Sequence, residues 1–461
     1  MLNYLWLALV SLAVLIGGAT GRLQEVTAGA FQMADTAVMK IALPLVGIMA
    51  LWLGLMRLAE HSGLVQQLAR GLRPLMRRLF PDVPPNHPAM GSMLMNMAAN
   101  MLGLANAATP LGLRAMRDLE TLNPNPGTAT NAMCTFLAIN TASIQLLPTT
   151  AIAILAAQHA KDPTAIVGTA FLASICATTS GLVAVKWMER WRIFRPAPAT
   201  AGAAAAGVPT AAPATSPVAL PEPAPMPVWG RFAVALLLAA FATLLAWIVV
   251  APASYHTATT ALSARIFPPQ VSPSAWEDTS AQHLVLRAIG ALSLLAVPFL
   301  LVFFPLYAAL RGVKVYEEFV EGAKEGFQVA LRVIPFLVAI LVAVGMFRGA
   351  GGIEALKSVL APLLTPLGFP PDLLPLVLVR PLSGSATTGL FAEIAQRLGP
   401  DSLTTRMAGT IFGSTETTFY VIAVYFGSVA VRRTRHAVAA GLIADFAGVV
   451  ASVVICRLMF G

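Results

Sequence analysis

The chain has 461 residues, of which 57% are apolar and only 11% are charged. Soluble domains carry about a quarter charged residues, so this composition excludes a water-soluble globular protein and indicates a polytopic membrane protein. The formal net charge of +9 comes from Arg and Lys in short stretches between apolar runs, which is typical of cytoplasmic loops. No basic patch is interleaved with aromatic residues, so a nucleic-acid partner is not expected.

Metal and disulfide chemistry are not expected either. The cysteines Cys134, Cys176 and Cys456 lie far apart in apolar runs, with no ligand spacing. No nucleophile–base pair and no phosphate-binding glycine loop is recognisable, which argues against an enzyme and against a resident cofactor.

The first part of the chain predicts two membrane spans and then a helix in the membrane interface. Residues 2–18 are uncharged and no basic segment precedes them, which favours a retained transmembrane helix over a signal peptide. A second span is predicted at residues 41–56, with a kink at Pro44. In residues 64–80, leucines recur every three or four positions and arginines occupy the rest of the wheel, as in an amphipathic interfacial helix.

Residues 89–113 are moderately apolar but interrupted by amides, glycines and Pro110. This composition favours a re-entrant hairpin over a single kinked span, because irregular backbone at membrane depth is tolerated where it is buried in protein or lines a cavity. A second region of this kind, residues 371–391, follows a short amphipathic segment at residues 353–364.

The remaining apolar runs complete the predicted topology. The nine expected spans are residues 2–18, 41–56, 131–157, 164–188, 229–250, 284–310, 329–347, 407–429 and 437–460. An Ala/Pro-rich stretch with almost no charge is predicted to be a disordered linker. The chain is thus divided into a first repeat with the N-terminal helix (1–195), the linker (196–227), two connecting spans (228–315) and a second repeat (316–461).

The two halves of the chain repeat weakly. Matching positions include Pro44, Gly54 and Arg57 with Pro335, Gly345 and Arg348, the run Asn140–Ser143 with Thr415–Thr418, and Lys186 and Met188 with Arg457 and Met459. Counting Lys and Arg in short loops places the two copies in opposite orientations, provided that each hairpin enters and leaves on the same side. The predicted fold is therefore all-α, with two inverted repeats that each contain an interfacial helix, a re-entrant hairpin and a discontinuous helix.

Polar residues inside these apolar segments are the candidate site. Glu416 and Asp445 are carboxylates within predicted spans, where a charged side chain is costly unless it faces protein, water or a ligand, and both are candidates for ion coupling. For the hydroxyl residues, close helix packing is the competing explanation. The expected binding residues are Asn96, Asn100, Asn106, Asn140, Thr141, Ser383, Ser385, Thr387, Thr388, Ser414, Thr415, Glu416 and Thr417.

Two motifs resemble a known pair of families. Residues 100–113, which read NMLGLANAATPLGL, resemble the signature of spore maturation protein A. The sequence from Arg380 to Ser385, together with that from Gly413 to Thr417, resembles spore maturation protein B. The chain is similar to a fusion of the two, which carry the nucleoside-recognition or Gate domain. Through this domain it is distantly similar to concentrative nucleoside transporters, and that similarity implies solute-binding roles for Asn100, Asn106, Asn140, Ser385, Thr388 and Glu416. The first hairpin departs from those carriers because it offers amides and no carboxylate.

These observations lead to two hypotheses. The first is a secondary carrier in the bacterial inner membrane that moves a small polar solute (nucleoside-like, cell-wall-related or an ion) through a midplane site between the hairpins, with a coupling proton or cation at Glu416. Its expected partners are the lipid bilayer and further copies of the chain. The second is a non-transporting membrane scaffold in cell-envelope or spore maturation, in which the polar cluster only fixes helix registry.

Overall fold

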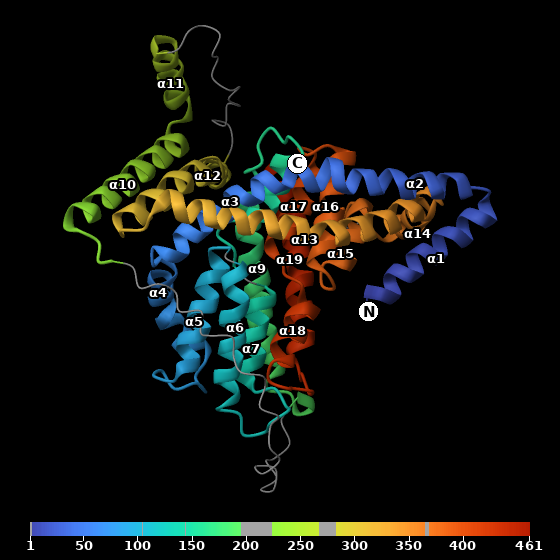
Figure 1. The fold of residues 1–461 in the computed structure, drawn as a ribbon, viewed down its shortest axis with the longest axis horizontal. Helices are drawn as coiled ribbons and strands as arrows, with labels where there is room; N and C mark the ends of the chain where they lie inside the picture. Colours follow the sequence, from blue (N-terminus) through green and yellow to red (C-terminus); the bar gives the residue numbers. More distant parts are fainter. Residues whose placement is uncertain (1, 104, 143, 195–223, 267–282, 365–367) are drawn as a thin grey trace.

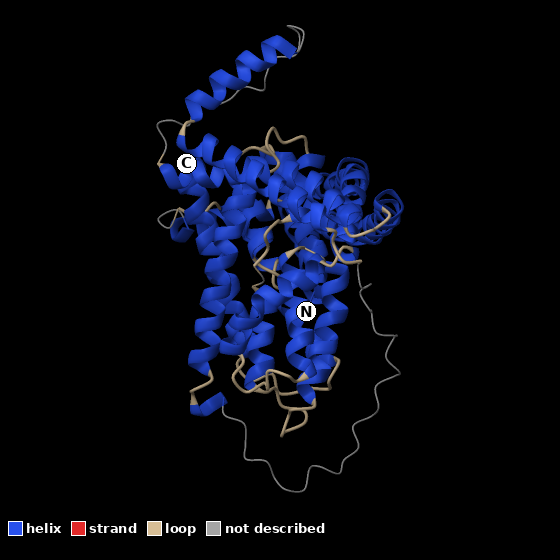
Figure 2. Ribbon diagram, turned by 90° about the vertical axis from the view of Figure 1, so that its left-hand side faces the viewer, coloured by secondary structure: helices blue, strands red, loops and turns tan. Residues whose placement is uncertain are grey.

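The computed structural model describes residues 2–103, 105–142, 144–194, 224–266, 283–364 and 368–461. Within these ranges the chain is helical and forms no strand, apart from an isolated bridge between Thr128 and Arg433 (Figure 2). The predicted linker falls almost wholly outside the described residues. Six described helices are long and apolar enough to cross a membrane, and α1 (Leu2–Thr20) contains a shorter apolar run, so the chain is a multi-pass membrane protein.

The first half of the chain runs from α1 to α9. Its further helices are α2 (Leu23–Asp35), the π-helix η1 (Thr36–Ala42), α3 (Leu43–His61), α4 (Leu64–Leu79), α5 (Pro88–Met101), α6 (Ala105–Glu120), α7 (Asn131–Thr141), α8 (Thr149–Ala157) and α9 (Ile166–Met188), with a short 3-10 turn at Arg192–Phe194. The amphipathic helix predicted at residues 64–80 is confirmed as α4.

The rest of the chain repeats much of this order. Its helices are α10 (Val228–Val250), α11 (Pro252–Ile266), α12 (Leu284–Leu310), α13 (Val315–Gly349), α14 (Gly352–Leu364), the 3-10 turn η4 (Pro371–Leu373), α15 (Leu374–Val379), α16 (Gly384–Leu398), α17 (Leu403–Ser414), α18 (Thr418–Gly427) and α19 (Ala437–Phe460). The helix α11 was not predicted, because its polar residues suggested a loop.

The second span predicted at residues 41–56 lies within a longer helix, and the kink predicted at Pro44 stays a prediction. The helix is continuous from Leu23 to His61, and Pro44 stands at the start of α3, directly after the π-helix. Proline has no N–H to donate to the preceding turn, and a wider π turn accommodates that loss without breaking the helix. Likewise, α13 begins at Val315 rather than at residue 329, because the charged stretch before the apolar run is also helical.

The regions predicted as hairpins each form a pair of helices. In the first, Gly103 adopts a left-handed φ of 76° between α5 and α6, a conformation that glycine reaches without strain. A single kinked span is therefore excluded at this position. In the second region, α15 and α16 are joined by a turn at residues 380–383. Two predicted spans are interrupted as well, since α7 and α8, and α17 and α18, are separated by non-helical residues.

Two sets of long helices run in nearly perpendicular directions (Figure 1). The stretch from α2 to α3 lies against α13, while α9 and α19 pack against each other in a direction nearly perpendicular to it. The first contact is very close: a Cβ on Gly322 would lie 2.6 Å from the Leu53 carbonyl oxygen, and one on Gly345 would lie 2.7 Å from the Gly29 carbonyl oxygen. Small residues allow membrane helices to approach in this way.

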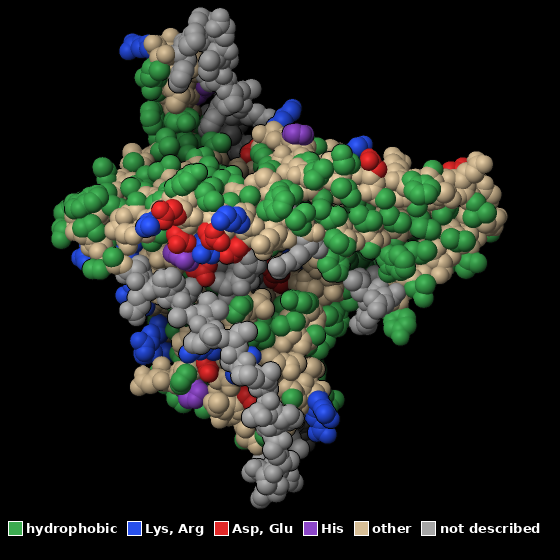
Figure 3. Space-filling model, viewed as in Figure 1, with side chains coloured by type: hydrophobic (Ala, Val, Ile, Leu, Met, Phe, Trp, Pro, Cys, Tyr) green, Lys and Arg blue, Asp and Glu red, His purple; other side chains and the backbone are tan. Residues whose placement is uncertain are grey.

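Hydrophobic side chains gather over α2 and the later part of α13 on the face shown in Figure 3, whereas the start of α13 carries charged side chains. On α10, Trp229, Phe232 and Leu236 are each at least 67% exposed in the isolated chain. An exposed apolar surface of this extent is expected where helices contact lipid rather than water.

Candidate functional site

A cavity of about 230 Å³ lies where the two hairpin regions and the two interrupted helices meet. The first half contributes the end of α5 and the segment from Gln145 to the start of α8, and the second half contributes the turn before α16 and the segment around Glu416. Its lining residues are Asn100, Gly103, Gln145, Pro148, Thr149, Thr150, Ala151, Arg380, Gly384, Thr388, Phe412, Glu416 and Thr417.

The two helix interruptions touch each other. The Glu416 backbone N–H donates a hydrogen bond of 3.0 Å to the Thr141 carbonyl, which lies at the end of α7. The Gln145 side-chain amide then donates to Glu416 Oε1 at 2.7 Å. In a continuous helix, the Thr141 carbonyl and the Glu416 N–H would be hydrogen-bonded within their own helices, and the side chains would be oriented differently. The interruptions therefore bring these residues together.

Arg380 is the most deeply buried charge beside the cavity, with 4% of its surface exposed. Its Nη2 donates to the carbonyls of Phe412, at 2.8 Å, and Thr415, and its Nε donates to Thr415 Oγ1 at 3.3 Å. The guanidinium lies 4.5 Å from the Phe412 ring centroid. These contacts fix the cation in one position, since they engage the end of α17 from several directions.

Glu416 is the counter-ion of Arg380. Its Oε2 lies 3.8 Å from Arg380 Nη2, and its side chain is 34% exposed towards the cavity while that of Arg380 is 5% exposed. A buried cation held by backbone carbonyls needs a nearby anion in a medium of low dielectric constant. The pair therefore presents a carboxylate to the cavity with a fixed positive charge behind it.

An amide network covers the side of the cavity that the first half contributes. Asn100 donates from Nδ2 to Asn140 Oδ1 at 2.9 Å, and Asn140 donates from its own Nδ2 to the Phe136 carbonyl. The Tyr425 hydroxyl donates to Asn140 Oδ1 at 3.4 Å, and Asn96 Nδ2 donates to the Ala108 carbonyl at 2.7 Å. Asn100 alone of these residues lines the cavity, and the others hold it in place.

Most of the predicted hydroxyl residues hydrogen-bond within the protein. Ser383 caps α16 by accepting from the Ala386 N–H, and Thr387 and Thr388 donate to carbonyls one turn earlier. Ser414 bonds to the Ile411 carbonyl and to Ser452. Thr141 donates to the Ala138 carbonyl, and Thr415 donates to the Ile411 carbonyl while it accepts from Arg380.

Of the predicted binding residues, the structure brings four to the cavity wall: Asn100, Thr388, Glu416 and Thr417. Ser385 is half-buried in α16 and does not line it. The side chain of Asn106 lies outside what the structure describes. The remaining predicted residues do not line the cavity, and they support the residues that do.

Asp445 lies on α19, outside the cavity lining. Its Oδ2 accepts a hydrogen bond of 2.7 Å from Thr418, the first residue of α18, whereas Oδ1 has no hydrogen-bond partner in the part of the chain that the structure describes. The carboxylate thus ties α19 to the restart of the interrupted helix. Its predicted role in ion coupling stays a prediction.

Three residues of the site were missed by reasoning from the sequence: Arg380, Gln145 and Tyr425. Arg380 was recognisable, because it is a charge in an apolar segment, the same criterion that singled out Glu416. Gln145 and Tyr425 give no such signal, since one follows a run of small polar residues and the other is an aromatic residue in an aromatic-rich span.

The described residues contain no group of three or more His, Cys, Asp or Glu side chains that could hold a metal ion. The donors at the cavity are instead amides, hydroxyls, one guanidinium and one carboxylate. Such a set suits directional hydrogen bonding to a polar organic solute, or weak coordination of a hard cation by oxygen atoms.

Comparisons with known proteins agree with this arrangement of two halves. The family model Gate, described as nucleoside recognition, matches residues 42–158 and 330–432. Spore maturation protein A of Bacillus subtilis (strain 168) is 43% identical over 183 residues, which cover 40% of this chain and 93% of that protein. Spore maturation protein B of the same organism is 42% identical over 176 residues, covering 38% of this chain and 99% of that protein.

The chain belongs to the spore maturation protein family. The resemblance read from the motifs is thereby confirmed, and none of the matching descriptions names an enzymatic activity. The segments matched by the Gate model contain both helix interruptions and all of the cavity-lining residues. No solved structure matches the chain, so the distant similarity to concentrative nucleoside transporters stays a prediction.

Proposed function

We propose that this chain is a bacterial inner-membrane protein of the secondary-transporter type, which moves a small polar solute through the cavity at Glu416. The supporting observation is the cavity itself: four irregular segments, two from each half, surround a carboxylate that is partly exposed to it. Solute sites of secondary transporters are commonly built from interrupted helices at the interface between two repeats.

The packing of equivalent elements supports the inverted repeat on which this proposal rests. The sequence repeat pairs Thr141 with Glu416, and these two residues share the hydrogen bond between the interruptions. It also pairs α3 with α13, and α9 with α19, and each helix packs against its counterpart. Equivalent elements meet each other in this way where they lie next to an axis of two-fold pseudosymmetry.

The dimensions and polarity of the cavity favour a small solute. Pockets for drug-sized ligands span about 300–1,000 Å³, so a cavity of about 230 Å³ suits an ion or a molecule no larger than a nucleoside. Asn100, Gln145 and Thr417 would orient such a solute, because each places a polar side chain at the wall. Glu416 would bind the solute or carry the coupling proton or cation.

A membrane scaffold is the second candidate, favoured by the internal pairing of Ser383, Thr387, Ser414 and Thr415. Hydroxyls that bond only within the protein fix helix registry and have little capacity left for a solute. On this hypothesis the cavity would be a packing defect between two halves that organise other envelope proteins. The relatives' names describe a process of maturation and no transported substance.

The two candidates are separated by ligand-induced stabilisation and by uptake. Purified protein is screened by thermal shift against nucleosides, cell-wall precursors and metal ions, and any stabilising compound is tested for uptake into proteoliposomes. We expect Glu416→Gln, which keeps the size of the side chain but removes its charge, to abolish stabilisation and uptake. A matched control, Glu354→Gln, removes an exposed carboxylate on α14 and should change neither.

The scaffold hypothesis predicts a different result. No compound class would stabilise the wild type, and Glu416→Gln would leave complementation of a deletion strain unchanged. That outcome would overturn the transport proposal.

A further inference from the structure

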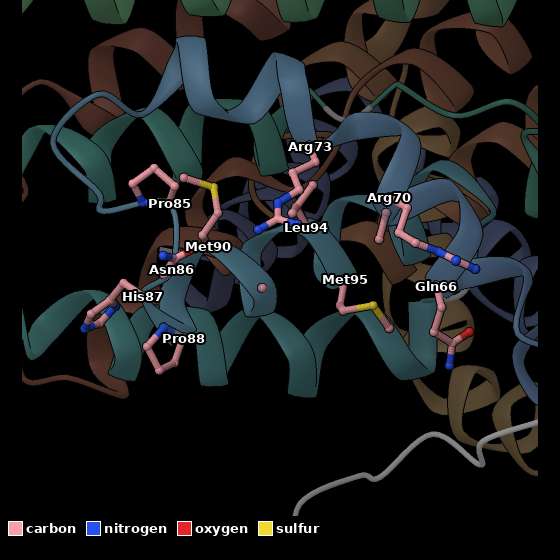
Figure 4. A pocket seen from close by; sticks show the side chains of 12 residues that line it. Gln66, Arg70, Arg73, Pro85, Asn86, His87, Pro88, Met90, Leu94 and Met95 are labelled. Carbon is pink, nitrogen blue, oxygen red and sulfur yellow. The ribbon is translucent and has the colours of Figure 1, made fainter.

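A second and larger cavity, of about 520 Å³, opens between the amphipathic helix α4 and the hairpin helix α5 (Figure 4). It shares no lining residue with the cavity at Glu416. We call it the α4–α5 groove, and its lining residues are Gln66, Ala69, Arg70, Arg73, Pro85, Asn86, His87, Pro88, Met90, Gly91, Leu94 and Met95.

The α4 side of the groove is cationic. Arg70 and Arg73 line it, and both are exposed. Neither forms an ion pair with a carboxylate of the described residues, and α4 contains no acidic residue at all. Two guanidinium groups one helical turn apart present several N–H donors to the same space, which suits the planar recognition of a phosphate group.

The α5 side of the groove is apolar. Met90, Leu94 and Met95 line it opposite Arg73 and Arg70 (Figure 4), and of the three only Met95 is more than marginally exposed. Between them, a Cβ built on Gly91 would meet no atom within 4 Å, so the floor is open there. Methionine side chains adapt their shape to flexible hydrocarbon. The groove therefore pairs an anion-binding side with a surface that an acyl chain can cover.

We propose that the α4–α5 groove binds an anionic phospholipid, with the headgroup phosphate on Arg70 and Arg73 and the start of an acyl chain over Gly91 and Met95. Charge complementarity carries this assignment, because a soluble anion would leave the apolar side uncovered and an uncharged lipid would leave both arginines unpaired. An arginine-rich amphipathic helix is expected on the cytoplasmic side, where anionic lipids make the leaflet surface negative. The proposal does not depend on transport.

The test compares two double variants on the same helix. Full-length protein, purified in detergent, is titrated with phosphatidylglycerol or phosphatidylcholine of identical acyl chains at about 0.15 M salt, where long-range effects of charge are screened. The lipid-dependent rise in Tm gives an apparent affinity. We expect phosphatidylglycerol to stabilise the wild type and Arg70→Gln/Arg73→Gln to weaken that affinity by about tenfold or more, since each arginine supplies charge-assisted hydrogen bonds.

The matched control is Arg77→Gln/Arg78→Gln, which removes the same charge from exposed positions of α4 that do not line the groove. We expect it to change the affinity by less than about twofold. Equal weakening by both double variants would overturn the proposal in favour of general electrostatic attraction. Equal stabilisation by phosphatidylcholine, or full stabilisation by inorganic phosphate alone, would overturn it as well.

A second variant tests the apolar side without altering charge. Gly91→Leu fills the open floor, and we expect it to weaken phosphatidylglycerol binding while the Tm without lipid is kept. Its control is Gly71→Leu on α4, where an added Cβ also meets no atom within 4 Å but where the residue is not part of the groove. Unchanged binding in Gly91→Leu would contradict the assignment of the acyl chain to this floor.

Discussion

The two helix interruptions at the cavity occupy equivalent places in the two halves, yet their chemistry differs. The one between α7 and α8 has the amide of Gln145, with that of Asn140 in the last turn of α7, whereas the one between α17 and α18 has Glu416, with Arg380 against it. The residues between the helices also differ in number: 142–148 in the first half and 415–417 in the second. The two interruptions that the sequence repeat pairs therefore differ in charge, and both charged groups lie in the second half.

This difference shows how a buried site can contain polar groups at a limited cost in stability. A neutral amide pair such as Asn100 and Asn140 satisfies its own hydrogen bonds and needs no counter-ion. The carboxylate of Glu416 needs Arg380, and Arg380 in turn needs the carbonyls of Phe412 and Thr415. The uncharged interruption is therefore expected to tolerate substitution better than the charged one.

The largest effect should come from Arg380→Ala. It removes the counter-ion of Glu416 and the donors to two carbonyls at the end of α17, so we expect the free energy of unfolding to fall by about 3 kcal/mol, the lower end for a broken buried pair because Glu416 is partly exposed. Thermal unfolding in detergent measures the loss. Arg380→Lys should recover only part of it, since one ammonium cannot replace the planar fork. No loss in Arg380→Ala would refute the proposed asymmetry.

The matching change in the first half is Asn140→Ala, and we expect a smaller loss, of about 2 kcal/mol. The substitution removes the hydrogen bonds that the Asn140 side chain makes with Asn100 and with the Phe136 carbonyl but strands no charge. The same unfolding measurement applies to both variants. If Asn140→Ala proved as damaging as Arg380→Ala, the cost would lie in the repeated geometry rather than in the charges.

A further difference lies at the start of α19, where His436 is buried and neither ring nitrogen has a hydrogen-bond partner among the described residues. The alignment that pairs Lys186 with Arg457 places Ala165 at the same position before α9. Burial, together with the neighbouring Arg435 and Lys186 cations, lowers the pKa of His436 to about 4. The unfolded chain binds that proton near pH 6.5, so stability is full above pH 6.5 and falls as the pH drops towards 4.

We expect His436→Phe to remove this pH dependence, because Phe keeps the edge contact with Phe194 and has no nitrogen to protonate. Between pH 6.5 and 5.5 the free energy of unfolding should change by less than about 1.4 kcal/mol, which is the value for one proton per pH unit, since solvent near the loop screens the charge. Thermal unfolding at several pH values checks it. The exposed His256→Phe is the control, and a wild-type profile that is flat from pH 7 to 5 would count against the prediction.

The smallest effect is expected from Tyr425→Phe. It removes a 3.4 Å hydrogen bond to Asn140 and keeps the ring beside Phe136, so the loss should be about 0.5–1 kcal/mol. Urea or thermal unfolding would detect it only beside the wild type in the same preparation. A loss as large as that of Asn140→Ala would show that the hydroxyl, rather than the amide, organises the first half.

Much of the fold was predictable because apolar length and periodicity determine where membrane helices can lie. The amphipathic α4 followed from the spacing of its leucines, and the hairpin around Gly103 followed from a composition of amides and glycines that favours irregular backbone buried in protein over a span in contact with lipid. The helical form of residues 315–328 and of α11 was missed, because hydropathy reports burial in lipid and is silent on polar helices that leave it.

The site was predictable in part for a similar reason. Glu416 stands out as a charge in an apolar run, and Asn100 as an amide in a hairpin. Whether a hydroxyl points into a cavity or back to a carbonyl depends on rotamers and on the exact end of a helix, which explains why Ser383 is a helix cap rather than part of the wall. The contact between Gln145 and Glu416 requires the full tertiary arrangement.

The close crossing of α13 with α2 and α3 has a consequence for how mutations are distributed over the molecule. Gly322, Gly326, Gly345 and Gly349 each stand where the smallest side chain would strike the main chain opposite. A methyl group at any of these positions would push α13 away from α2 and α3. Positions that are far from the cavity and carry no chemistry of their own are therefore expected to tolerate substitution poorly.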